Sequence, residues 1–226
     1  MEMEVNGYKI EPGADLAGAH LKGENLSGEN LKGANLEGAN LRRAELIGTN
    51  LRGANLKGAN LERANLNSFN EINHWMFEYE GKHPDDAQFQ ETELDDADLS
   101  NANLRGANLT EAHLNDANLK DADLTAANLS GAWLYDVNLS GSCLDGANLS
   151  NARMGRANLS GASLFLTDLS GADLSGANLT GTDLSETHLH RADLSGANLT
   201  GVDLSEAHLD DAYLTGATMP DGSIHE

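Results

Sequence analysis

Leucine recurs at every fifth position over most of this chain, and this spacing restricts the fold more than any other feature of the sequence. It occupies every fifth position from Leu16 to Leu66 and again from Leu94 to Leu214, with Met154 as the one replacement. The residue two places before each leucine is small, usually alanine, and the residue between them is usually asparagine or aspartate. A period of five matches neither the 3.6-residue turn of an α-helix nor the two-residue alternation of a β-strand. The chain must therefore turn inward once per unit, with the leucine and the small residue inside.

Units of five residues are too short to bury a core alone, so they must stack on their neighbours as a solenoid. The two blocks hold 11 and 25 such units. Their pattern, A(D/N)LXX, resembles the pentapeptide-repeat family, and the central leucine together with the closing residues 219–226 is similar to cyanobacterial members. The resemblance implies an all-β fold: a right-handed quadrilateral β-helix with four repeats per coil, about nine coils, and one inserted loop or short helix.

The repeat pattern divides the chain into five segments. In order, we expect an N-terminal cap, a first block of coils, an insertion that forms a short helix and a loop, a second block of coils and a C-terminal tail, over residues 1–13, 14–66, 67–88, 89–219 and 220–226. A capping box at Ser68 and Glu71 predicts the helix, with Gly81 as its stop. The first block alone forms fewer than three coils and would be only marginally stable, so we expect one rod that continues through the insertion.

The insertion is rich in aromatic residues. Ile72, Trp75, Met76 and Tyr79 fall at i, i+3, i+4 and i+7, so they share one apolar helix face. One interpretation is that this face packs sideways on the wall of the solenoid. The other is that the loop projects and presents Trp75 and Tyr79 to a protein partner, because aromatic residues often dominate the energy of interfaces. The sequence alone leaves both interpretations open.

With four repeats per coil, residues 20 positions apart stack on the outer surface. One such column brings Trp133 beside Arg153, which predicts a cation–π pair, with Tyr135 nearby. This spot is a candidate partner contact, and ordinary surface packing is the alternative. Another column is almost all asparagine and predicts a structural ladder of amide hydrogen bonds. Its residues are Asp98, Asn118, Asn138, Asn158, Asn178 and Asn198.

Three histidines share one predicted wall near the C-terminus, where stacking brings together His188, His190 and His208, beside Asp168 and Asp210. Imidazole and carboxylate groups at such spacings could share a divalent metal, but a regular surface also acquires such residues by chance. Nothing in the sequence orients them as ligands, so we assign no metal site. The sequence contains no recognisable glycine-rich phosphate loop before a helix and no oriented nucleophile. We therefore expect no catalytic residue and no cofactor.

The chain carries 14 basic and 36 acidic residues, a net charge of −22, and this charge is unevenly distributed. Residues 1–66 carry a net −1 and residues 67–226 a net −21. Such a surface repels phosphate, which argues against direct binding to nucleic acid or to an anionic membrane. We interpret the acidic surface, including a predicted column of Asp96, Asp116 and Asp136, either as a device for solubility or as an imitation of DNA phosphates that attracts basic partners.

We expect a cytoplasmic protein, because the N-terminus lacks a signal-peptide pattern, no apolar stretch is long enough to span a membrane, and Cys143 is the one cysteine. The preferred function is a non-catalytic rigid scaffold, or protein-interaction module, that binds an unidentified protein through an outer wall or the 67–88 loop. The alternative is an acidic DNA mimic that inhibits or protects a DNA-binding enzyme such as a topoisomerase. Family members that protect gyrase favour phenylalanine at the central positions, whereas leucine or methionine fills all of them here.

Overall fold

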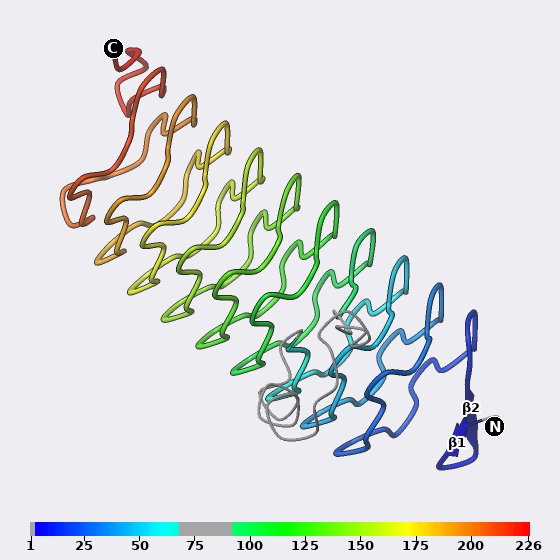
Figure 1. Ribbon diagram of the computed structural model, residues 1–226. Helices are drawn as coiled ribbons and strands as arrows, with labels where there is room; N and C mark the ends of the chain where they lie inside the picture. The colour runs from blue at the N-terminus through cyan, green and yellow to red at the C-terminus, as the bar shows by residue number, and fades with distance from the viewer. Residues whose placement is uncertain (1–2, 68–91) are drawn as a thin grey trace, which may run out of the picture.

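The chain winds into one elongated coil. The computed structural model describes residues 3–67 and 92–226, and over these residues the backbone advances along one axis from the N-terminus to the C-terminus (Figure 1). Two short strands, β1 (Met3–Val5) and β2 (Tyr8–Ile10), form an antiparallel hairpin at the start. The repeats that follow contribute isolated parallel bridges, because each five-residue unit turns before a strand can extend.

The parallel bridges join residues 20 positions apart, so four repeats complete one coil. Asp15 bridges Asn35, Asn35 bridges Asn55, and the same step continues along the chain. The four repeats of a coil form four faces, which we define on one coil. Face A holds residues 132–136, face B 137–141, face C 142–146 and face D 147–151, each together with the residues stacked on it in the other coils. The predicted β-helical solenoid is therefore present.

Each corner of the coil is closed by the backbone and by the asparagine or aspartate of the repeat. The Ala39 N–H donates to Leu36 O at 2.9 Å, and this i+3 to i bond recurs in repeat after repeat. The Asn138 carboxamide oxygen accepts from the Ser140 N–H, two residues on, at 3.2 Å. The last residue of most repeats has a left-handed backbone, which favours glycine. Several polar residues and one large apolar residue, Leu166 (φ 56°), adopt the same conformation.

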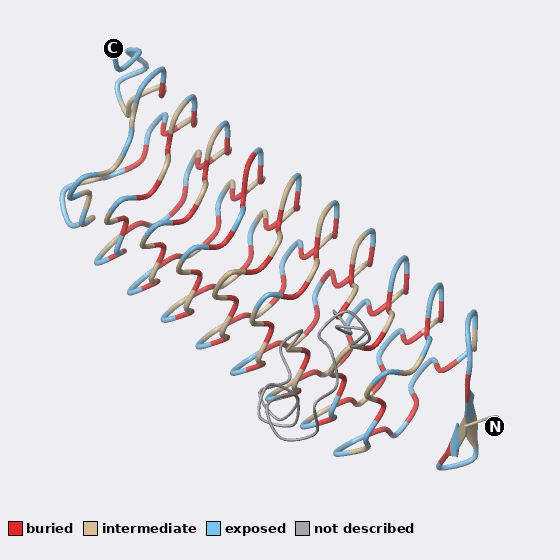
Figure 2. Cartoon of the chain, viewed as in Figure 1, coloured by how far each residue is buried: buried red, intermediate tan, exposed pale blue. Residues whose placement is uncertain are grey.

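Leucine and alanine fill the interior along the rod (Figure 2). The repeat leucines from Leu16 to Leu199 are at most 1% exposed. Threonine at a small inward position does not interrupt this core, because its hydroxyl donates to a main-chain carbonyl, of the preceding coil for Thr49, Thr167 and Thr187 and of the same coil for Thr182. Thr167 Oγ1 donates to Leu144 O at 2.7 Å, for example. The hydroxyl is thereby satisfied, whereas an unpaired buried hydroxyl would destabilise the fold.

The ladder of bridges continues across the insertion. Asn65 bridges Asn108, which lies 43 residues further along instead of the usual 20. The two described residues that flank the insertion meet at the corner between faces D and A, where Thr92 Oγ1 donates to Asn67 O at 3.2 Å. The prediction of one rod is thus confirmed. The predicted short helix, with Trp75 and Tyr79, lies outside the described residues.

The two ends of the rod are finished differently. At the N-terminal end, inside the predicted cap, Val5 and Ile10 of the β1–β2 hairpin join the buried core. At the C-terminal end, the predicted tail of residues 220–226 turns back, so that Ile224 pairs antiparallel with Thr218. The last leucines pack against the core but are only partly buried. The hydrophobic core is therefore covered more completely at its beginning than at its end.

Candidate functional site

Face A carries a continuous stack of aromatic and basic side chains. His113, Trp133 and Arg153 occupy one column in three successive coils, joined by parallel bridges. The rings of His113 and Trp133 are tilted by 46° with centroids 5.2 Å apart, and Arg153 Cζ lies 3.8 Å from the centroid of the Trp133 ring. The predicted cation–π pair is therefore present. Trp133 is half-buried and Arg153 is exposed, so the stack lies at the surface.

Tyr135 lies beside this stack and covers a glycine. A Cβ atom added at Gly155 would lie 3.0 Å from Cδ1 and Cε1 of Tyr135, so the phenol ring rests on the glycine backbone. Sequence reasoning missed this contact. The available signal was that Gly155 is the one glycine at the position directly after the repeat leucine or methionine. The absence of a side chain there allows the Tyr135 ring to lie flat against the wall.

A bidentate ion pair borders the same spot. Arg156 Nε donates to Asp136 Oδ1 at 2.8 Å, and Arg156 Nη2 contacts the other carboxylate oxygen. These hydrogen bonds hold the pKa of Asp136 below its usual range and raise the pKa of Arg156. We call Trp133, Tyr135, Arg153 and Arg156 the aromatic–arginine cluster. Its members are held by stacking, by close packing and by ion pairing.

The acidic column of face A is partly neutralised. Asp96, Asp116 and Asp136 do lie in consecutive coils, as predicted. Asp136 is paired with Arg156, and Asp96 Oδ2 lies 3.7 Å from Arg52 Nε. The mutual repulsion expected for three stacked carboxylates is therefore offset at both ends of the column.

Face B holds the predicted amide ladder. From Asn118 to Asn178, the Nδ2 group of each asparagine donates to the side-chain oxygen of the residue one coil earlier, at 3.1 to 3.3 Å, whereas the predicted last member, Asn198, is outside this run of bonds. The bonded residues are Asp98, Asn118, Asn138, Asn158 and Asn178. Because each amide is used within the ladder, this column is structural and offers few free groups to a ligand.

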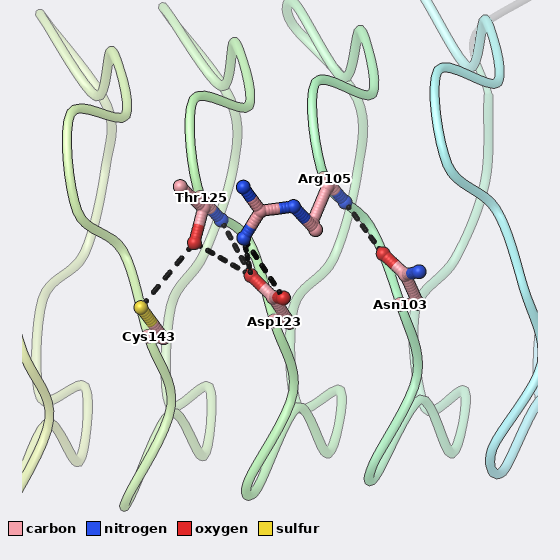
Figure 3. A network of polar contacts seen from close by, with 5 residues as sticks. All are labelled: Asn103, Arg105, Asp123, Thr125 and Cys143. Carbon is pink, nitrogen blue, oxygen red and sulfur yellow. Dashed lines mark hydrogen bonds and ion pairs between the residues drawn. The ribbon is translucent and has the colours of Figure 1, made fainter.

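Face C replaces the ladder by a local polar network (Figure 3). Arg105 Nη1 donates to both carboxylate oxygens of Asp123, at 3.4 and 3.2 Å. The hydroxyl and the N–H of Thr125 donate to Asp123 Oδ1 at 2.6 and 3.1 Å, and Thr125 Oγ1 lies 3.3 Å from Cys143 Sγ. Burial raises the pKa of Asp123, but the hydrogen bonds from Thr125 and Arg105 outweigh it and leave this pKa below its usual range. The network orders the wall and leaves no unpaired base.

The histidines on face D do not assemble into a metal site. The rings of His188 and His208 are tilted by 55° with centroids 5.2 Å apart, and His208 Nε2 lies 3.5 Å from Glu186 Oε2. Within residues 3–67 and 92–226, no group of three or more histidine, cysteine, aspartate or glutamate side chains is arranged to hold a metal ion. The same residues contain no helix that is long and apolar enough to cross a membrane.

A family model described as "Pentapeptide repeats" matches the sequence with eight copies. The matched residues are 13–46, 30–67, 85–120, 102–141, 142–181 and 182–219. No curated protein matched the chain.

Three solved structures illustrate the similarity. HetL, described as a pentapeptide repeat protein involved in heterocyst differentiation regulation from the cyanobacterium Nostoc sp. strain PCC 7120, is 32% identical over 89% of this chain and 92% of its own, with a TM-score of 0.42. Rfr23, from the cyanobacterium Cyanothece 51142, is 29% identical over 73% and 86%, with a TM-score of 0.20. QnrB1, described as a plasmid-mediated fluoroquinolone resistance protein, is 22% identical over 84% and 88%, with a TM-score of 0.43.

Proposed function

Because the chain belongs to the pentapeptide-repeat family of right-handed β-helical solenoids, we propose that it is a non-catalytic scaffold of about nine coils that binds a protein partner through face A. The observation that carries the proposal is the aromatic–arginine cluster, in which Arg153 Cζ lies 3.8 Å from the Trp133 ring centroid. Tryptophan, tyrosine and arginine are the residues that most often supply the binding energy of protein interfaces. Leucine and alanine fill the interior, so the outer walls carry the recognition.

The position of the insertion also supports face A as the partner surface. The insertion begins and ends at the corner between faces D and A, beside Thr92. Glu93 begins the face A column after the insertion, and Trp133 follows two coils later in that column. Two coils correspond to roughly 10 Å at the usual spacing of strands. The described residues on either side of the insertion therefore lie beside the face that carries the cluster, and Trp75 and Tyr79 stay predicted contacts.

The cluster is also well prepared for binding. Tyr135 is fixed against Gly155, Arg156 is fixed by Asp136, and Arg153 is fixed over Trp133. Side chains that are already ordered lose little conformational entropy when a partner binds, and this improves affinity. The wall is therefore suited to a rigid partner surface with an apolar centre.

The acidic DNA mimic remains the second candidate, favoured by the net charge of −21 over residues 67–226. A mimic needs unpaired negative charge at regular spacing. Asp96, Asp123 and Asp136 each lie within salt-bridge distance of an arginine of the same chain. The internal pairing reduces the resemblance to a row of phosphates, so we place this function second.

The test begins with a partner captured on the full chain from a lysate of the source organism and then titrated directly. Trp133→Ala should weaken binding by about 2 kcal/mol or more, as a hot spot does, with little dependence on salt. Tyr213→Ala, an exposed aromatic of the same column four coils away, is the matched control and should bind normally. Trp75→Ala tests the predicted contact in the insertion.

Replacing Asp96 and Asp116 together by asparagine separates the two candidates, because neither residue holds a member of the aromatic–arginine cluster, whereas Asp136 holds Arg156 and is left in place. The scaffold hypothesis predicts normal binding by this double variant. If the double variant binds slowly and weakly, and if wild-type binding falls steeply between low and physiological salt, the DNA mimic takes the place of the scaffold.

A further inference from the structure

On face C, the basic residues lie toward the N-terminal end of the rod and most acidic residues lie toward the C-terminal end. Its residues are 19–23, 39–43, 59–63, 102–106, 122–126, 142–146, 162–166, 182–186 and 202–206. All its basic residues lie in the first four of these repeats: Lys22, Arg42, Arg43, Arg63 and Arg105. The remaining five repeats contain only acidic charges: Asp123, Asp145, Asp183, Glu186, Asp203 and Glu206. Glu62 is the one acidic residue among the first four. The other faces do not separate their charges in this way; Arg156 on face A and Arg191 on face D, for example, lie in the C-terminal half.

Part of this charge is unused within the chain. Glu62 pairs with Arg42, and Asp123 pairs with Arg105, so these four charges cancel. Lys22 and Arg43 are exposed, and Arg63 is exposed with its Nε 4.0 Å from Glu62 Oε1. After Arg105, face C offers no lysine or arginine to its carboxylates. The acidic half of this face is therefore a site for basic groups that come from outside it.

The acidic half also exposes an apolar pair. Phe165 is 42% exposed and Leu166 is 50% exposed, at the corner between faces C and D. Leu166 has a φ of 56°, in the region that disfavours residues with a Cβ atom. The corresponding residues one coil on either side are Gly146 and Glu186. A large apolar side chain that is both exposed and strained contributes little to folding, which points to a contact outside the chain.

The charges of face C match those of a second copy of the same face that runs in the opposite direction. Ala126 is the midpoint, with four coils of face C on each side. Reversing the face about this point sets each of the first four repeats, which hold the basic residues, against one of the last four, and it brings Arg63 opposite Phe165, where a guanidinium can lie on the ring. The opposed residues are Lys22 with Glu206, Arg43 with Glu186, and Arg63 with Phe165, while Arg105 and Asp123 near the centre remain paired within their own chain. The corner residues at the centre, Gly106, Ala126 and Gly146, are small enough for two chains to approach closely.

We propose that face C binds a second copy of this chain in antiparallel orientation, with the two-fold axis beside Ala126. Such an interface is isologous, so each contact occurs twice. The net charge of −22 opposes association at long range, but this repulsion is screened beyond ~8 Å at physiological salt, whereas charges in direct contact are screened less. Face C stacks continuously from repeat 59–63 to repeat 102–106, since Asn60 bridges Asn103. The contact is independent of the proposed partner surface on face A.

The experiment measures the oligomeric state of the full chain by sedimentation equilibrium, up to about 0.1 mM in physiological salt. The wild-type chain should form dimers. Arg43→Glu and Glu186→Lys should each raise the dimer dissociation constant by about tenfold or more, because each reversal creates two like-charge contacts. An equimolar mixture of these two variants should recover the wild-type constant, since every reversed charge then faces its opposite.

Two further variants sharpen the result. Lys57→Glu reverses an exposed charge on face B and should leave the dimer unchanged. The double variant Phe165→Ser/Leu166→Gly should weaken the dimer, and its thermal unfolding verifies that it is folded. A wild-type chain that stays monomeric at the highest concentration overturns the proposal. A dimer that tolerates Arg43→Glu, or a mixture that fails to recover association, overturns it as well, because the contact then lies elsewhere.

Discussion

Faces B and C belong to the same coils, yet they use the position before the leucine in opposite ways. On face B this column carries the ladder from Asp98 to Asn178. On face C the same column changes from Asn103 to Asp123, Cys143, Ser163 and Asp183. Both columns make the same parallel backbone bridges from coil to coil. The same backbone bridges therefore form with different side chains in this column, so its residues can differ from face to face.

The two faces also satisfy their polar groups differently. On face B an asparagine bonds to the next coil, so the hydrogen bonds run along the rod. On face C, Asp123 is satisfied by Thr125 and Arg105 at its own level and the level before it. An amide ladder adds the same contact at each coil, whereas a local network permits a different residue at every level. The charge separation of face C is possible for this reason.

The largest loss of stability is expected from a substitution in the core that faces B and C share. Leu139 is fully buried, and Leu139→Asp would bury an unpaired carboxylate at a cost of about 4 kcal/mol or more. Because each coil is stabilised mainly by its neighbours, we expect several coils to unfold together. Circular dichroism during thermal unfolding measures the loss.

Ser150→Asp is the matched control, since it adds the same carboxylate to the outer wall of the same coil. It should shift the melting temperature only slightly. A Leu139→Asp protein that melts cooperatively at the wild-type temperature would contradict the inward assignment of the repeat leucines.

The period of five was sufficient to predict the core, whereas the four-repeat coil came from the resemblance to the pentapeptide-repeat family. Once four repeats make a coil, residues 20 positions apart stack, and counting along the sequence then predicts the ladder of face B and the stacking of Trp133 on Arg153. The contact of Tyr135 with Gly155 was missed because it depends on the side-chain rotamer as well as on position. The exposed Leu166 was missed because its left-handed backbone is fixed by the corner and is not visible in the leucine period. The roles of the predicted contacts and the cytoplasmic location stay predictions.

A smaller loss of stability should differ between face B and face C. Asn138 accepts from the amide of Asn158 at 3.3 Å and donates to Asn118 at 3.2 Å, while Ser140 donates to it twice. Asn138→Ala breaks the ladder in its middle and leaves half-buried groups unpaired, so it should cost about 1–2 kcal/mol in the free energy of unfolding. Urea denaturation measures this quantity.

Ser163→Ala is the matched substitution on face C. It removes one side-chain hydrogen bond, from Ser163 Oγ to Asp145 Oδ1 at 2.5 Å, and should cost less than about 1 kcal/mol. Equal losses for the two variants would mean that the ladder of face B adds no more stability than the local contacts of face C.

The smallest expected change is a gain in stability. It tests whether face C keeps a destabilising residue because that residue makes a contact with a second copy. Leu166→Gly removes the strain of a left-handed leucine, which is about 1–2 kcal/mol, but glycine regains part of this as extra freedom in the unfolded chain. The net gain should be about 0.5–1 kcal/mol, or roughly 1–4 °C in melting temperature for a chain of this size. Gly146→Leu, one coil earlier at an equally open corner (φ 64°), should lose a similar amount of stability.

If Leu166→Gly were instead clearly destabilising at a protein concentration where the chain is monomeric, the leucine would have a packing role within its own chain. A gain in the monomer combined with weaker dimerisation would mean that this corner is kept strained for the contact it makes with a second copy.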